Sequence, residues 1–191
     1  MTKYLSQNDL EKIYRKEIKN IGKKGIVEKV SKKRLTDNIL PHSHQMFLSH
    51  SHIDKTIVSK ISLLFDRLNT ELYIDWLDKS LPEETNLKTA KTIKIKIEKS
   101  KKFLFLATYH GLRSKWCNWE LGMADVLLTD ENLAILPIQS KSGNWKGNEY
   151  LQLYPEMILE MDEIENLNEN NIFIRKPSSG ETISLLNWLN K

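Results

Sequence analysis

A carboxylate and an indole, Glu120 and Trp116, are the side chains whose types and spacing point most clearly to chemistry. They lie four residues apart in Ser114–Leu128, a segment that predicts a helix capped by its first residue. Residues four apart share one helical face, so both can border the same cavity. Apart from Glu120 and Asp125 the segment after Trp116 carries no charge, so most of it must face protein. A carboxylate there needs a task or a partner, and a structural Glu120 bonded to Arg113 or backbone is as well supported as a functional one.

Four histidines form two H-x-H pairs, His42 with His44 and His50 with His52. Alternate histidines on a strand can bind a metal ion from one face. These two pairs flank an expected strand, however, and no cysteine or glutamate completes a ligand set with a familiar spacing. We therefore expect turn and surface histidines, and no metal site.

Several catalytic and nucleotide-binding motifs are absent from the sequence. It has no G-x-x-x-x-G-K-[ST] phosphate loop and no G-x-G-x-x-G after a strand. Its serines lack the G-x-S-x-G elbow of serine hydrolases. The single cysteine, Cys117, lies in the apolar helix, where cysteine behaves as a small hydrophobic residue. One cysteine also excludes an internal disulfide, which fits a cytoplasmic protein.

Alternating strands and helices must position these residues. Strands are expected at 45–49, 72–76, 102–108, 133–138 and 172–174, with helices at 55–69, 87–97 and 115–128 between the first four. An acidic, helix-like segment is expected at 156–166. Strands alternating with helices of this length form right-handed βαβ units. The expected fold is α/β, a five-stranded parallel sheet of flavodoxin-like order with helices on both faces and its site at the carboxyl ends of the strands.

Residues 1–44 are expected to form a basic helical extension, and residues 45–191 the α/β domain. Five apolar residues between positions 10 and 21 have the spacing of an amphipathic helix. Residues 1–40 carry eleven Lys or Arg against five Asp or Glu. Such a run can bind nucleic acid, but a solvated helix face is the commoner explanation and the one we favour. No apolar run approaches the roughly 20 residues of a membrane span, and we expect no secretory signal.

Four segments, in order, resemble motifs of Toll/interleukin-1 receptor (TIR) domains. Residues 47–54, F-L-S-H-S-H-I-D, resemble the F-[IL]-S-[HY]-S-x-x-D start of these domains. Residues 73–82 are similar to their second strand and BB loop, and residues 114–122 to the W-x-x-x-E segment of NAD-cleaving members. Residues 145–155 resemble a tail of stand-alone bacterial TIR proteins, including the TIR component of Thoeris anti-phage defence. The likeness spans about residues 45–190 and implies a TIR fold.

The resemblance implies an enzyme, a NAD+ glycohydrolase or ADP-ribosyl cyclase that breaks the nicotinamide–ribose bond. NAD+ would be the substrate, with no further cofactor. Glu120 would be the catalytic carboxylate that stabilises an oxocarbenium-like ribose. With water excluded, an internal nucleophile could capture the ribose and give a cyclic product. The residues implied to bind the substrate are Ser49, His50, Asp75, Trp76, Asp78 and Trp116.

The partners that the resemblance implies are further copies of the chain and a separate effector. Closed TIR sites commonly involve two chains, and the nucleotide product would reach the effector as a signal in bacterial immunity. We expect neither a membrane nor a nucleic-acid partner. The alternative is a non-catalytic adaptor that acts by self-association, with Glu120 structural. The sequence does not decide between a linear and a cyclic product, or whether Trp76 or Trp145 stacks on the substrate. Because the loop at 79–84 is acidic, it also leaves open where the diphosphate of the substrate would lie.

Overall fold

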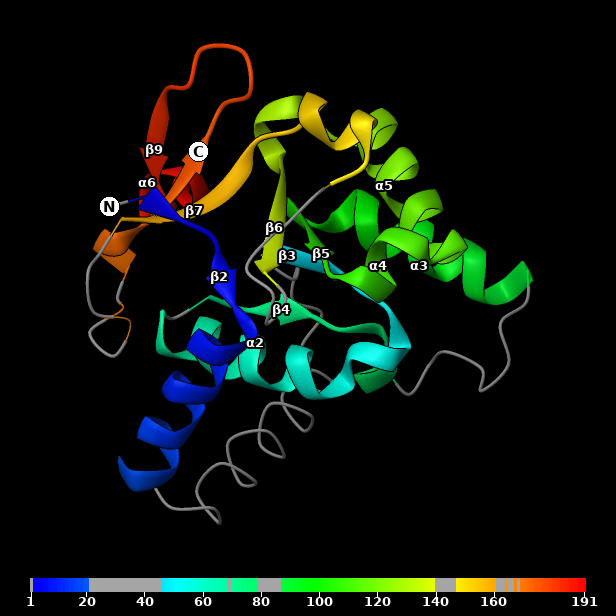
Figure 1. Ribbon diagram of the computed structural model, residues 1–191. Helices are drawn as coiled ribbons and strands as arrows, with labels where there is room; N and C mark the ends of the chain where they lie inside the picture. Colours follow the sequence, from blue (N-terminus) through cyan, green and yellow to red (C-terminus); the bar gives the residue numbers. More distant parts are fainter. Residues whose placement is uncertain are drawn as a thin grey trace.

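A central sheet covered by helices on both faces is the main feature of the fold (Figure 1). The computed structural model describes residues 2–20, 46–68, 70–78, 87–139, 147–160, 164, 167 and 169–191. The sheet has the order β4-β3-β5-β6-β7-β8-β9, with β1 paired to β7 and β2 paired to β6. Its strands are β1 (Thr2–Lys3), β2 (Leu5–Ser6), β3 (Met46–Ser49), β4 (Leu72–Tyr73), β5 (Lys102–Ala107), β6 (Leu133–Gln139), β7 (Glu156–Glu160), β8 (Ile172–Arg175) and β9 (Thr182–Ser184).

The helices connect these strands, and several begin at a serine or threonine cap. The side chains of Thr108, Ser114 and Ser184 each accept a backbone N–H at the start of α4, α5 and α6. Residues 7–20 form a further helix. The remaining helices are α2 (Lys55–Arg67), α3 (Leu87–Lys99), α4 (Tyr109–Arg113), α5 (Lys115–Leu127) and α6 (Leu185–Asn190), with short 3-10 turns η1 (His52–Asp54), η2 (Asp75–Leu77), η3 (Asp130–Asn132), η4 (Glu149–Leu153) and η6 (Glu169–Asn171).

The parallel part of the sheet has the order expected from the sequence. Strands β4, β3, β5 and β6 run parallel, and β7 continues them through the pair Ile135 and Glu156. The order β4-β3-β5-β6-β7 is the flavodoxin-like order 2-1-3-4-5, so the α/β class is confirmed. The winding direction reverses between β3 and β5. Ligands of such sheets bind at this reversal, beside the carboxyl ends of the strands.

The strand count and the fifth strand differ from the prediction. Residues 156–160, expected to be an acidic helix, form β7, and Met157, Ile158 and Leu159 are all buried in it. Residues 172–174, expected as the fifth parallel strand, lie in β8, which pairs antiparallel with β7. Strand β9 then adds a second antiparallel pair, so the sheet has nine strands within the described residues and not five. The acidic ends of β7 gave a helical pattern, but tertiary burial of its centre decided the conformation.

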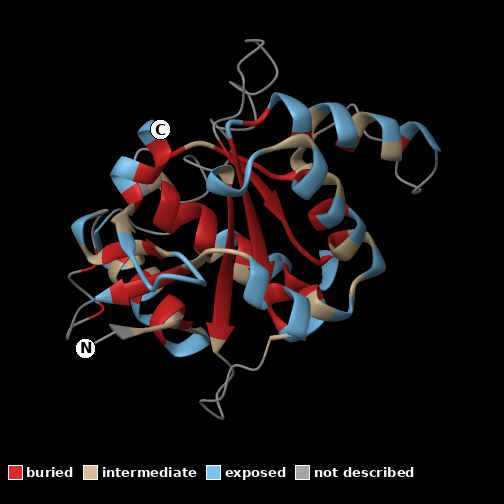
Figure 2. Cartoon of the chain, turned by 90° about the horizontal axis from the view of Figure 1, so that it is seen from above, coloured by how far each residue is buried: buried red, intermediate tan, exposed pale blue. Residues whose placement is uncertain are grey.

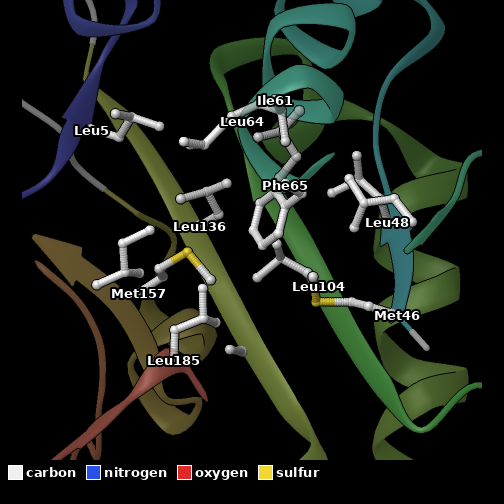
Figure 3. Packing of buried hydrophobic residues seen from close by; sticks show 14 of the residues in the cluster. Leu5, Met46, Leu48, Ile61, Leu64, Phe65, Leu104, Leu136, Met157 and Leu185 are labelled. Atoms are coloured by element: carbon white, nitrogen blue, oxygen red, sulfur yellow. The ribbon is translucent and has the colours of Figure 1, made fainter. Parts of the chain in front are cut away.

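Successive residues of the central strands pack into two separate cores, one on each face of the sheet. In β3, Met46 and Leu48 belong to the core beneath α2 and α6, whereas Phe47 belongs to the core beneath α3 and α5. In β5, Leu104 joins the first core and Phe105 the second, which explains the continuous apolar run of that strand. Figure 3 shows the first core, where Phe65 of α2 lies over the sheet.

The segment before residue 7 is built into the sheet. Strand β2 pairs with the end of β6 and β1 with the end of β7, so this short stretch lies between two strands that diverge. The Tyr4 hydroxyl donates to Glu156 Oε2 at 2.8 Å. One Arg175 nitrogen donates to Tyr4 at 2.9 Å and to Glu156 at 2.7 Å. Backbone pairing and this three-residue network therefore tie the first residues to β7 and β8.

The helix over residues 7–20 agrees with the amphipathic spacing of the sequence. Ser6 and Asp9 cap its start, because Asp9 N–H donates to Ser6 Oγ at 3.1 Å and Ser6 N–H donates to Asp9 Oδ2 at 3.0 Å. Leu10 and Ile13 are buried in the core beneath α2. The boundary at residue 44 stays a prediction, because residues 21–45 lie outside the described part of the chain.

Burial is concentrated in the strands, which are enclosed by helices whose outer faces are exposed (Figure 2). Among the described residues, no helix has both the length and the apolar character needed to cross a bilayer.

Candidate active site

A cavity of about 210 Å³ opens at the carboxyl ends of β3 and β4, between α3 and α5. It lies at the reversal between β3 and β5, where ligands of this class of sheet bind. Four chain segments supply its walls: the turn after β3, the turn after β4, helix α3 and the start of α5. The lining residues are His50, Ser51, His52, Asp75, Thr89, Ile93, Ser114, Trp116 and Glu120.

Helix α5 brings Trp116 and Glu120 to this cavity together, as their spacing predicts. The helix begins where the Ser114 side chain accepts the N–H of Cys117 at 3.2 Å. One turn later Glu120 is only 5% exposed, although it borders the cavity. The ring of Trp116 meets that of Trp119 edge to face, with centroids 4.9 Å apart. Trp119 therefore supports one side of the Trp116 ring while the helix holds the carboxylate beside it.

Glu120 is a buried acid held by one hydroxyl. Ser49 Oγ, at the end of β3, donates to Glu120 Oε2 at 2.6 Å. Burial raises the pKa of Glu120 to about 8, with a smaller raising effect from the charge of Asp75, and the Ser49 hydrogen bond opposes the rise. A positive charge entering the cavity would favour the ionised form. The site is therefore set up to place a carboxylate beside a cationic ligand.

Asp75 lies at the cavity wall between two histidines. Its Oδ2 is 2.9 Å from His52 Nε2, and its Oδ1 is 3.2 Å from His50 Nε2. Burial opposes ionisation of Asp75, but the hydrogen bond with His52 favours the charged form, and the pKa lies well below its usual range. The same contact raises the pKa of His52. The Asp75 carboxylate is therefore charged at neutral pH and gives the cavity wall a fixed negative group.

Two of the predicted substrate-binding residues, Trp76 and Asp78, are not among the residues that line this cavity. Trp76 packs partly against the core beneath α2, and its ring meets His50 edge to face at 4.6 Å. Asp78 Oδ2 accepts from the Tyr73 hydroxyl at 2.8 Å and pairs with Lys96 at 3.1 Å. Both follow β4, but of the residues around the η2 turn only Asp75 lines the cavity.

The structure brings the other predicted site residues together at the cavity. Four of them line it, namely His50, Asp75, Trp116 and Glu120, and Ser49 joins them through its hydrogen bond with Glu120. The loop at 79–84 lies outside the described residues, as do His42, His44 and Trp145. Within the described part of the chain, no three histidine, cysteine, aspartate or glutamate side chains are placed to share a metal ion.

Sequence reasoning missed two cavity residues from α3, Thr89 and Ile93. They are four apart on one face of the helix, the same signal that linked Trp116 to Glu120, but neither side chain suggests chemistry. The one thiol near the site is inactive: burial raises the pKa of Cys117 to about 12, so it remains protonated at neutral pH.

A second hydrogen-bonded group fixes the rim of the site. Thr108, at the end of β5, donates through its hydroxyl to the buried carboxylate of Asp54 and accepts the N–H of Gly111 at 2.9 Å. Position 111 requires glycine, because a Cβ there would lie 2.4 Å from the carbonyl oxygen of Leu106. The turn after β3 and the start of α4 are thereby tied together ahead of α5.

Comparison with known proteins agrees with this geometry. The chain is 29% identical over 150 residues to a Bacillus cereus (strain MSX-D12) protein named "Probable 3' cyclic ADP-D-ribose synthase ThsB'", covering 76% of this chain and 75% of the relative. It is 33% identical over 94 residues to a Cytobacillus dafuensis protein named as a candidate cyclic ADP-D-ribose synthase, TIR2. That match covers 47% of this chain and 25% of the relative. A family profile described as TIR domain matches residues 46–163, which include every residue that lines the cavity. The chain belongs to the TIR domain family.

Proposed function

We propose that this TIR protein breaks the nicotinamide–ribose bond of NAD+ and closes the ADP-ribose into a cyclic nucleotide. The observation that carries the proposal is the buried Glu120 carboxyl at the wall of a strand-end cavity, one helical turn from Trp116. Family membership and the names of the two relatives support the same reaction class. NAD+ acts as the substrate, and no other cofactor is required.

The chemistry of NAD+ cleavage fits the groups of this cavity. The nicotinamide leaving group is cationic, so its bond to ribose breaks without strong acid assistance. The main barrier is formation of an oxocarbenium-like ribose, which a nearby carboxylate stabilises. Glu120 fills that role, and Ser49 holds its Oε2 through the bond at 2.6 Å. The positive charge of the bound nicotinamide riboside favours the ionised form of Glu120, so substrate binding itself charges the carboxylate.

Exclusion of water decides what captures the ribose cation. Trp116 and Ile93 give the cavity two apolar walls, and His50 and Ser51 of the turn after β3 are buried beside it. A water molecule that reaches the cation gives linear ADP-ribose, whereas a nucleophile of the substrate itself gives a ring. The printed name of the Bacillus cereus relative specifies a 3' cyclic product. We assign this chain the same product class, with a ribose hydroxyl as the capturing group.

The size of the cavity supports a role for self-association. At about 210 Å³ it is smaller than the roughly 300–1,000 Å³ of common ligand sites, so it holds the nicotinamide riboside end and the hydroxyl that attacks it, and not the whole dinucleotide. The adenine must lie against surfaces beyond the lining residues, which a second copy of the chain can supply. In this proposal the assembled protein works in the cytoplasm, and its cyclic product signals to a separate effector in anti-phage defence.

The experiment compares wild-type protein with Glu120→Gln, which keeps the shape of the side chain and removes its charge. Each is incubated with NAD+ alone and with lysate of phage-infected cells, and the products are identified by mass spectrometry. Wild type should consume NAD+ and release nicotinamide with a cyclic product, and Glu120→Gln should lose the activity while its circular dichroism is unchanged. Glu98→Gln, on the exposed face of α3, is the matched control and should retain activity.

Undiminished NAD+ consumption by folded Glu120→Gln would contradict the role of this carboxylate. No NAD+ consumption by wild type with every lysate would contradict the enzyme itself, and would favour an adaptor that acts by self-association.

A further inference from the structure

One ring nitrogen of His50, Nδ1, makes a hydrogen bond, and the other, Nε2, does not. Its side chain is 1% exposed, and Nδ1 lies 2.8 Å from the carbonyl oxygen of Leu48. A carbonyl oxygen only accepts hydrogen bonds, so Nδ1 carries the proton. In the neutral ring, Nε2 then holds a lone pair and can only accept. The backbone of β3 thus fixes the tautomer of His50.

The free nitrogen has no hydrogen-bond partner in the described structure. Asp75 is its polar neighbour, with Oδ1 at 3.2 Å, but the two are not aligned for a hydrogen bond. Each oxygen of Asp75 already takes part in one hydrogen bond. Oδ1 accepts the N–H of Trp76 at 2.7 Å, and Oδ2 is hydrogen-bonded to His52 Nε2 at 2.9 Å. Among the described residues, His50 Nε2 is the one buried side-chain polar atom without a partner. A buried polar atom without a partner calls for an explanation, and a catalytic role is one that fits a residue lining the cavity.

Ring closure in the proposed reaction requires a proton acceptor beside the ribose hydroxyl that attacks. When a ribose hydroxyl captures the cation, the bond from that oxygen to the ribose C1 forms as the bond from C1 to nicotinamide breaks. Nicotinamide leaves as a neutral molecule with the electron pair of its bond. The hydroxyl proton must then go to a base, because the product is otherwise an oxonium ion. A base within hydrogen-bond reach of the hydroxyl lowers this barrier.

We propose that Nε2 of His50 accepts the proton of the ribose hydroxyl that closes the ring, an assignment that rests on the proposed cyclase function. His50 lines the same cavity as Glu120 and Trp116, so the three residues border one substrate. Asp75 is the positioning residue. Its carboxylate lies beside Nε2 and stabilises the imidazolium that forms when the proton arrives.

The other ionisable groups of the cavity are less suited to this step. The Glu120 carboxylate faces the ribose cation and is held by Ser49. The Asp75 oxygens already accept two hydrogen bonds. The His52 ring is 63% exposed at the mouth and uses its Nε2 to bond Asp75. His50 alone among these residues combines complete burial with an unused lone pair.

This assignment separates ring closure from bond cleavage. Water that attacks the ribose can pass its proton to other water molecules, so hydrolysis needs no fixed base. A substrate hydroxyl enclosed by protein cannot do so. Loss of His50 Nε2 should therefore change the product and not the rate at which nicotinamide leaves.

The test is His50→Asn, because the asparagine amide reproduces the Nδ1–H that donates to Leu48 and deletes only the Nε2 side of the ring. Nicotinamide release and the ratio of cyclic to linear ADP-ribose are measured together on the full chain. We expect release within a few-fold of wild type, and a ratio that falls by roughly 10²-fold, the usual contribution of a positioned base. The matched control is His110→Asn on the exposed face of α4, which should keep the wild-type ratio.

A second variant, Asp75→Asn, keeps oxygen and amide groups at that position and removes only the charge. It should lower the ratio in the same direction by a smaller factor, and it keeps the test available if His50→Asn does not fold. An unchanged ratio in an active His50→Asn protein overturns the proton-acceptor assignment and leaves the proposed function standing. A parallel fall in nicotinamide release and ring closure also overturns it, because His50 would then serve binding or folding. Absence of NAD+ cleavage by wild type overturns the proposed function, and this assignment with it.

Discussion

Glu120 shows how a site residue can work against the stability of its own fold. The Glu120 carboxyl is buried against Ser49 and lies close to Asp75. Its pKa of about 8 means that the neutral acid is favoured at neutral pH. The proposed reaction needs the carboxylate, whereas burial favours the neutral acid. Under that proposal Glu120 becomes active when a cationic substrate binds and favours its charged form.

The pH dependence of NAD+ cleavage should follow this ionisation. Because kcat/KM reports the groups of the free enzyme and the ionised Glu120 is the active form, kcat/KM should rise from pH 6 and level off above about pH 8. The measurement is the initial rate of nicotinamide release at low NAD+ concentration, in buffers of constant ionic strength. A profile that is flat or falls over this range would contradict the assigned role, and Glu98→Gln should give the wild-type profile.

At the level of single residues, the sequence predicted the part of the site that depends on helical geometry. The four-residue spacing placed Trp116 and Glu120 on one face without knowledge of the tertiary structure. Trp76 and Asp78 rest instead on the resemblance of residues 73–82 to the second strand and BB loop of TIR domains; they do not line the cavity, and their role stays a prediction. The contact between His50 and Asp75 depends on the alignment of two strands, which a single sequence does not encode locally.

The elements that carry the site are held by a few polar contacts at the strand ends. Thr108 is the clearest case, since its hydroxyl bonds both Asp54 and the backbone of Gly111. These contacts fix the turn after β3 against α4, next to the segment that supplies Ser49 and His50. The position of the cavity wall therefore depends on a residue that does not line it.

Thr108→Val should lower the free energy of unfolding by about 1–3 kcal/mol, because the buried carboxylate of Asp54 loses a donor. We also expect a several-fold lower kcat, since the turn after β3 loses its contact with β5. Chemical denaturation and nicotinamide release measure the two effects. The control is Thr56→Val on the exposed surface of α2, which should change stability by less than about 0.5 kcal/mol. Equal stability of the two variants would show that the Asp54 contact contributes nothing.

Among whole elements, long periodic segments were predicted well and short ones poorly. Helix α5 and the apolar run of β5 were found at nearly their observed bounds. The five residues of β7 were assigned to a helix because their glutamates mimic a helical surface. Helix α4, five residues long, was not predicted, since its only signal is the cap at Thr108.

For the molecule as a whole, the segment 2–20 is the largest departure from the expected picture. We expected a basic helical extension, and residues 7–20 are helical, but strands β1 and β2 pair with β7 and β6, and Leu10 and Ile13 are buried in the core. Two-residue strands have no detectable periodicity, and their partners are distant in sequence. The order of the parallel strands was predictable from the alternation of strands and helices, whereas the pairing of β1 with β7 and of β2 with β6 was not.

Leu10→Ala should destabilise the whole domain if this segment belongs to the core. Leu10 is 1% exposed, so the truncation leaves a cavity and should lower the free energy of unfolding by about 2–5 kcal/mol. Lys12→Ala on the exposed face of the same helix is the control and should have little effect. Urea denaturation followed by circular dichroism measures both. A neutral Leu10→Ala would indicate that the helix over residues 7–20 detaches without loss to the domain.

The position of the first strands also sets an order of events during synthesis. Leu5 pairs with Ile138 and Thr2 with Glu160, so these residues leave the ribosome long before their partners are made. Closing so long a loop is entropically costly and happens late. Strands β3 to β5, by contrast, form from neighbouring stretches of chain. During translation, the cavity walls can therefore assemble first, and the N-terminal strands complete the sheet only after β6 and β7 have been made.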